Sequence, residues 1–148
     1  NNLKFFKLPE KRDVHEGFYF SAKNLRKYVR RHVSKSTEKI LCIGHSRGGA
    51  LAEEINRYFV KYMEENSYTI SFGAPKLGGE EYLRESQDLK LNVDRYEFPR
   101  DIITKLPPFP GYYKYGNIHK LPQPWYFDFP IFKHIHLNYQ KGIKNIRR

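Results

Sequence analysis

Residues Gly44-His45-Ser46-Arg47-Gly48 place a serine between two glycines, in the pattern G-x-S-x-G. This pattern is typical of a serine nucleophile when it lies on a sharp turn between a buried strand and a helix. The backbone N–H of Arg47 would then face a developing oxyanion at the positive end of the helix. Because such a turn is strained and tight, we expect side chains at positions 44 and 48 to collide with the neighbouring strand and helix. Without that context, the same residues are only a turn.

A serine nucleophile needs a histidine that takes its proton and a carboxylate that orients the histidine. After this type of turn, the acid precedes the histidine in the chain. The aspartates that follow Ser46 stand at positions 88, 94, 101 and 128. Asp101 comes directly after an expected strand, at the sheet edge where such sites gather, whereas Asp94 lies inside that strand. A turn residue after Pro99 is an equally good interpretation of Asp101.

The candidate general bases are the histidines at positions 119, 134 and 136, and spacing alone does not choose among them. His134 and His136 are two residues apart, so they also fit a pair of metal ligands on one strand face. No cluster of Asp, Glu or Cys supplies a third ligand, which disfavours the metal interpretation.

Hydrophobic spacing predicts the elements that would position these residues. The expected elements are a helix at 18–33, a buried strand at 40–43, a helix at 50–66, a strand at 68–72, a short helix opening at 79–83 and a strand at 93–98. This alternation predicts a parallel sheet with helices across its faces, an α/β fold. Beyond Leu106, many prolines and aromatic residues predict an ordered, irregular, packed region. The length and composition predict one domain.

Five blocks of the sequence occur in an order that resembles the class 3 lipases, which are fungal-lipase-like α/β-hydrolases. The blocks are 14–18 (VHEGF), 44–52 (GHSRGGALA), 72–78 (FGAPKLG), 101–108 (DIITKLPP) and 136–139 (HLNY). The resemblance implies an α/β-hydrolase fold in which Ser46 is the nucleophile, Asp101 the triad acid and His136 the base. It also implies the backbone N–H of Arg47 as an oxyanion donor, and no metal or organic cofactor.

The same resemblance implies the reaction, which is hydrolysis of carboxylic esters of acylglycerols or other lipids, phospholipids included, through an acyl-enzyme. A non-catalytic, lipase-like binding or scaffold protein at lipid surfaces is the alternative from another class. A peptidase or thioesterase with the same serine turn is disfavoured only by the family blocks. Labelling of Ser46 by a fluorophosphonate would separate the enzyme from the scaffold.

The sequence departs from the family's pattern in three places. Arg47 stands where leucine is usual, and residues 114–116 (KYG) replace a loop that often carries histidine before glycine. The family's second oxyanion donor and lid helix belong to a segment upstream of Val14, of which only Asn2-Leu3 resembles the tail. We therefore expect residues 1–148 to be a single lipase domain that is incomplete at its N-terminus, with N-terminal strands missing, and weakly active or inactive by itself.

The chain is strongly basic, with 27 Lys and Arg against 16 Asp and Glu, a net charge of +11. This charge favours anionic surfaces such as a membrane or a lipid droplet, or only keeps the protein soluble. No nucleic-acid partner is expected, because no recognition pattern for nucleic acid is present. The aromatic run 125–132 (WYFDFPIF) fits either lipid contact or a core-packing loop before His136. Cys42, the single cysteine, is expected to be packed.

Overall fold

The computed structural model describes residues 13–34, 36–63, 66–122 and 136–146. The elements are α1 (Glu16–Arg30), β1 (Ile40–His45), α2 (Arg47–Met63), β2 (Ser67–Phe72), α3 (Glu80–Asp88), β3 (Asn92–Glu97), a short 3-10 turn η2 (Ile103–Lys105), β4 (Asn117–Lys120) and α4 (His136–Ile146). None of the helices in these ranges is long and apolar enough to cross a membrane.

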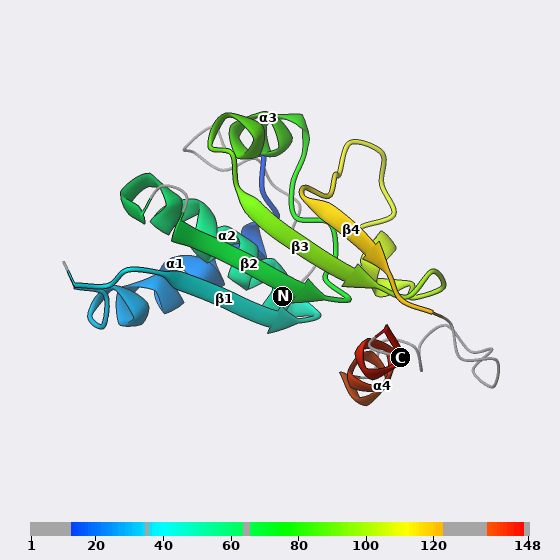
Figure 1. Cartoon of the computed structure of the whole chain (residues 1–148). Coiled ribbons are helices and arrows are strands. Elements are labelled where there is room, and N and C mark those ends of the chain that lie inside the picture. Colours follow the sequence, from blue (N-terminus) through cyan, green and yellow to red (C-terminus); the bar gives the residue numbers. More distant parts are fainter. Residues whose placement is uncertain (1–12, 35, 64–65, 123–135, 147–148) are drawn as a thin grey trace.

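The four strands form one sheet in the order β1-β2-β3-β4, and every neighbouring pair is parallel. Figure 1 shows the four arrows pointing the same way. α2 connects β1 to β2 and α3 connects β2 to β3, as parallel strands require a crossover. The carboxyl ends of β1, β2 and β3 therefore meet at one edge of the sheet, where the predicted site residues follow them.

α1 begins at a histidine cap. His15 is buried, and its Nδ1 accepts a hydrogen bond from the N–H of Gly17 at 3.1 Å. An acidic residue, Glu16, opens the helix and basic residues close it, which suits the helix dipole. Phe18 and Ala22 are buried on the inner face of α1. His15 thus fixes where α1 starts, close to the edge that carries Ser46.

One face of the sheet packs against α2, and α1 and α3 pack against α2. Ile40 on β1 contacts a cluster that includes Ala22 of α1 and Ile55 of α2. The opposite face is covered near its carboxyl edge by α4, which Figure 1 shows beside the ends of the arrows. On that face, Leu41 and Ile43 of β1 remain 55% and 61% exposed. Helices on both faces of a parallel sheet confirm the predicted α/β class.

A buried ionic cluster joins α2 to β3 beneath the carboxyl edge. Arg95 and Glu53 are fully buried and form an ion pair, and Arg95 Nε donates to Glu97 at 3.2 Å. Arg95 also donates to the carbonyls of Ala74 and Pro75 at 2.6 and 2.9 Å. Burial raises the pKa of Glu53, and the adjacent guanidinium of Arg95 opposes that shift. The cluster fixes the loop after β2 against the sheet.

The predicted elements up to residue 98 are confirmed as to type, with shifted ends. α2 begins three residues before the predicted start, and α3 extends to Asp88. The prediction of irregular structure beyond Leu106 is wrong in two places, because β4 and α4 lie there. β4 escaped prediction because all four of its residues are exposed and carry no alternating apolar pattern. The aromatic run 125–132 lies outside the described residues.

Candidate active site

Ser46 lies on the turn that joins β1 directly to α2. Its φ is 55°, a left-handed conformation that residues other than glycine rarely adopt. Its N–H donates to the carbonyl of Phe72 at the end of β2, at 2.8 Å, and its own carbonyl accepts from the N–H of Gly49 at 3.0 Å. These bonds hold the serine in the strained turn that the sequence predicts between a strand and a helix.

The prediction for the two glycines that flank Ser46 is confirmed at Gly44 and wrong at Gly48. A Cβ at position 44 would lie 2.1 Å from the carbonyl oxygen of Gly48, so Gly44 is sterically required. The prediction for Gly48 is wrong, since a Cβ there would meet nothing within 4 Å. The crowded position is Gly49, where a Cβ would lie 2.8 Å from the Cβ of Ala74 and 3.1 Å from that of Ser71. α2 therefore approaches β2 through Gly49, one residue later than expected.

Asp101 is fully buried just beyond the end of β3. Its Oδ1 accepts a hydrogen bond from the N–H of Ile103 at 2.9 Å, and its backbone carbonyl accepts from the hydroxyl of Thr104 at 2.9 Å. A Cβ on Gly73, the residue after β2, would lie 2.9 Å from Asp101 Oδ2. Ser46 thus borders Phe72, and Asp101 borders the next residue, Gly73, at the carboxyl edge of the sheet.

Tyr139 on α4 is a partner of Asp101 that the sequence did not predict. Its hydroxyl donates to Asp101 Oδ2 at 2.6 Å and accepts from the N–H of Phe98 at 3.3 Å. Burial, followed by the bond to Asp101, raises the pKa of Tyr139, so the hydroxyl stays protonated as the donor. The ring also packs against His45 and Phe72, with centroids 5.5 and 6.3 Å away. The only sequence signal was its place in the block 136–139.

α4 starts at His136, three residues before Tyr139. Residues three apart lie on neighbouring positions of a helix surface, about one turn apart, so the backbone at His136 is near the edge that Tyr139 contacts. The side chain of His136 is outside the described part of the structure, as is the whole of His134. The hydrogen bond from Ser46 to His136 therefore stays a prediction.

His119, the remaining candidate base, lies on β4. Its Nε2 is 2.7 Å from Asp94 Oδ1, both side chains are more than 40% exposed, and its ring stacks on Tyr96. In the described ranges, no group of three or more His, Cys, Asp or Glu is arranged to hold a metal ion. Cys42 packs in the cluster beneath α1 and α2, and burial raises the pKa of its thiol to about 11, which makes it unreactive.

A cavity of about 640 Å³ adjoins Ser46, and we call it the Ser46 pocket. It is lined by His15, Phe18, Ser46, Arg47, Pro75, Ile103, Leu106, Pro107, Pro108 and Phe109. Most of these side chains are apolar, and the volume lies within the range of ligand-binding sites. The pocket is therefore suited to an apolar group of a ligand that reaches Ser46. His15, to which the sequence gave no role, lines this pocket.

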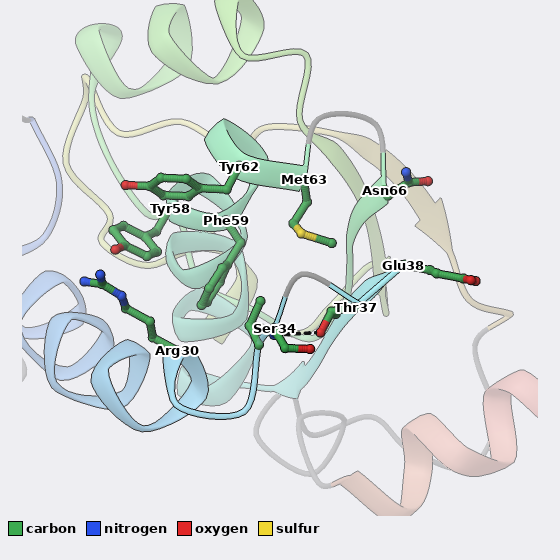
Figure 2. Close-up of a pocket in the computed structure, with 10 residues that line it drawn as sticks. Arg30, Ser34, Thr37, Glu38, Tyr58, Phe59, Tyr62, Met63 and Asn66 are labelled. Carbon is green, nitrogen blue, oxygen red and sulfur yellow. Dashed lines mark hydrogen bonds between the residues drawn. The ribbon is translucent and has the colours of Figure 1, made fainter.

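A second cavity of about 880 Å³ lies between the ends of α1 and α2, and we call it the α1–α2 pocket. It is lined by Arg30, Val33, Ser34, Thr37, Glu38, Tyr58, Phe59, Tyr62, Met63 and Asn66 (Figure 2). Glu38 precedes β1 and Asn66 precedes β2, so this pocket is at the amino edge of the sheet. Six residues of strand, about 20 Å, separate it from the Ser46 pocket.

A strand, a left-handed serine, a helix and an acid beyond a later parallel strand define an α/β-hydrolase fold. The sequence model of the lipase (class 3) family matches residues 2–111, and the chain belongs to this family. A search of curated protein sequences gave no significant match.

Solved lipase structures share this fold at low identity. The Rhizomucor miehei triacylglyceride lipase has a TM-score of 0.71 at 22% identity, over 80% of this chain and 50% of that one. The lipase of Rhizopus microsporus var. chinensis has a TM-score of 0.66 at 24% identity, over 75% and 42%. A third, a triacylglycerol lipase whose catalytic centre is described as a serine protease triad, has a TM-score of 0.70 at 22% identity, over 82% and 51%. The chain thus spans about half of these lipases.

Proposed function

We propose that this protein is a serine carboxylic ester hydrolase that acts on lipid esters, with residues 1–148 forming part of a single α/β-hydrolase domain. The observation that carries the proposal is the left-handed Ser46 at the end of β1, beside an apolar cavity of about 640 Å³. Membership of the class 3 lipase family supports this reaction. The triacylglycerol lipase with a serine protease triad is a structural neighbour that uses the proposed type of chemistry.

In the proposed mechanism, His136 takes the proton of Ser46 as the hydroxyl oxygen attacks the ester carbonyl carbon. The tetrahedral oxyanion collapses to an acyl-enzyme, and the alcohol leaves with the proton from His136. Water, deprotonated by the same histidine, then releases the fatty acid and restores Ser46. Asp101 accepts a hydrogen bond from the imidazole, which holds the required tautomer and stabilises the imidazolium.

The backbone N–H of Arg47 is the proposed oxyanion donor. Arg47 is the first residue of α2, and the first N–H groups of a helix have no acceptor within the helix. None of the described residues accepts a hydrogen bond from this N–H. It is therefore available to an oxygen bound at Ser46, at the positive end of the helix dipole.

Tyr139 acts as a positioning residue for Asp101, the proposed triad acid. The two carboxylate oxygens of Asp101 accept from Ile103 N–H and from Tyr139 hydroxyl, which fixes the plane of the carboxylate. Since Tyr139 and His136 share α4, the same helix would bring the base to the acid. One docked helix thus supports two members of the proposed triad.

The experiment for this function is covalent labelling with a fluorophosphonate probe, carried out on the natural full-length protein. We expect one labelled serine, and we expect labelling and ester hydrolysis to disappear in Ser46→Ala. Ser36→Ala, in the loop before β1, is the matched control and should be labelled like the wild type. A folded wild-type protein that takes up no probe would overturn the proposal and favour the scaffold alternative.

We also propose peripheral contact with anionic lipid surfaces. α1 exposes Phe20 and Tyr28, at 46% and 62%, on the side that also carries Lys27. Exposed aromatic and basic side chains on one helix face favour an anionic lipid interface. We expect the protein to sediment with phosphatidylglycerol vesicles at low salt and not with phosphatidylcholine vesicles. Equal sedimentation with both would contradict an electrostatic contact.

A further inference from the structure

The Ser46 pocket combines apolar walls with a single permanent charge. Among the described residues that line it, Arg47 alone carries a side chain that is always ionised. The other polar groups are the Ser46 hydroxyl and the buried His15. A neutral triglyceride would gain nothing from a cation here, whereas an anionic group on the substrate would.

The side chain of Arg47 is held in place from α1. Its Nη2 donates to the hydroxyl of Ser21 at 2.6 Å, and Ser21 is on the helix that also supplies Phe18 to the pocket. A single hydrogen bond uses one of the five N–H donors of a guanidinium, which leaves most of the fork available. The group is thus both fixed in position and open to an acceptor.

Arg47 is exposed, and its interactions differ from those of three cations that are buried or partly buried. Arg57, Arg95 and Lys114 each form an ion pair with a glutamate. Within the described ranges, no carboxylate pairs with Arg47. Its position at the first residue of α2 is one where the helix dipole disfavours a cation. The exposed guanidinium is therefore open to solvent, and an anion bound at the pocket would replace that water.

We propose that Arg47 binds the phosphodiester of a glycerophospholipid, so that the site hydrolyses phospholipid acyl esters in preference to neutral acylglycerols. The apolar walls take the acyl chain, which leaves the alcohol side of the ester toward the charged end of the pocket. A planar guanidinium fork matches two phosphate oxygens. This inference rests on the proposed ester hydrolysis at Ser46 and specifies its substrate class and the residue that selects it.

The test uses soluble dihexanoyl substrates below their micelle concentration, so that surface binding has no influence. The natural full-length protein is assayed with dihexanoyl-phosphatidylcholine, dihexanoyl-phosphatidylglycerol and dihexanoylglycerol. We expect Arg47→Leu to lower kcat/KM about tenfold to a hundredfold for both phospholipids, as expected for lost hydrogen bonds to a charged group. The substitution keeps the backbone N–H at position 47, so the value for dihexanoylglycerol should fall by a clearly smaller factor than either phospholipid value.

Two further variants sharpen the result. Arg47→Lys keeps the charge without the fork, and we expect an intermediate loss on both phospholipids. Lys61→Leu removes one exposed charge from the last turn of α2, away from the Ser46 pocket, and should change none of the three values. Unchanged fluorophosphonate labelling in Arg47→Leu will show that the variant is folded with Ser46 still activated.

Each other outcome overturns the inference. An equal loss of kcat/KM on all three substrates would mean that Arg47 has a structural role. No loss on any substrate would mean that Arg47 takes no part in substrate selection. A loss on phosphatidylglycerol alone would mean that net charge is recognised and not the phosphodiester. If the wild type hydrolyses esters without dependence on Arg47, only this inference fails. If the wild type neither hydrolyses an ester nor takes up the probe, the proposed function fails with it.

Discussion

The two pockets of this protein differ in what surrounds them, and the larger one is not the one beside the proposed nucleophile. The α1–α2 pocket, at about 880 Å³, is the larger, and Figure 2 shows its aromatic side chains along α2 near Arg30. The Ser46 pocket, at about 640 Å³, contains a strained serine and the start of a helix. Among the described residues other than glycine, Ser46 and Lys90 have a positive φ, and of these two Ser46 lines one of the two pockets.

The carboxyl and amino edges of a parallel sheet explain this difference. At the carboxyl edge, strands lead into loops and helix N-termini, which bring backbone N–H groups and side chains from several strands together. At the amino edge, chain segments enter the strands, and the α1–α2 pocket is closed by side chains that also pack the core, such as Phe59. We therefore expect substitutions at the two pockets to separate activity from stability.

The largest expected effect is loss of activity at the carboxyl edge. Asp101→Asn keeps the shape of the side chain but removes the charge that would stabilise an imidazolium, so kcat should fall about 10⁴-fold. Steady-state hydrolysis of dihexanoylglycerol by the full-length protein measures this. Asp94→Asn, which alters the exposed pair with His119, is the matched control and should keep wild-type activity. Equal losses in both variants would contradict the assignment of Asp101 as the acid.

A large loss of stability without loss of activity is expected at the amino edge. Phe59 is 3% exposed, and Phe59→Ala should lower the free energy of unfolding by about 3–5 kcal/mol by leaving a cavity. Tyr62, one turn further along α2 and 68% exposed, is the control, and Tyr62→Ala should cost less than about 0.5 kcal/mol. Urea denaturation measures both. If folded Phe59→Ala protein lost ester hydrolysis, the α1–α2 pocket would have to take part in the reaction.

The smallest expected effect tests the link between α4 and the acid. Tyr139→Phe removes a hydrogen bond to Asp101, so we expect kcat to fall about tenfold and the free energy of unfolding by about 1–3 kcal/mol. Tyr82→Phe is the control, because the Tyr82 hydroxyl is also buried and donates to a carboxylate, that of Glu53, at 3.3 Å. The control should lose stability and keep kcat. A similar fall in kcat for both would show that general loosening is responsible.

The parts of the site that could be predicted from the sequence are those set by local chain geometry. The turn at Ser46 is encoded by an apolar strand, Gly44 and an amphipathic helix that are contiguous in the chain. Asp101 was found because it directly follows a strand. Its choice over a turn residue, and the choice of His136 over other histidines, came from resemblance to a family and not from spacing.

The features that escaped prediction depend on contacts between distant segments. The bond between Tyr139 and Asp101 joins residues 38 apart, and nothing in the sequence near Tyr139 specifies that partner. Gly49, and not Gly48, is crowded because of Ala74 on a loop more than twenty residues away. The ion pair of Arg95 with Glu53 buries two charges, one on β3 and one on α2, where the sequence pattern predicts an apolar strand and an amphipathic helix. Tertiary packing decides each of these, so a local pattern cannot reveal them.

The left-handed backbone of Ser46 also affects the thermal stability of this protein. Glycine adopts that conformation at little cost, whereas a serine there costs on the order of 1 kcal/mol. A chain selected only for robustness would have glycine at position 46, and Ser46→Gly should give a protein that melts at a higher temperature and catalyses nothing. Under the proposed function, position 46 is thus one where the molecule loses some thermal stability and keeps a hydroxyl group next to its substrate.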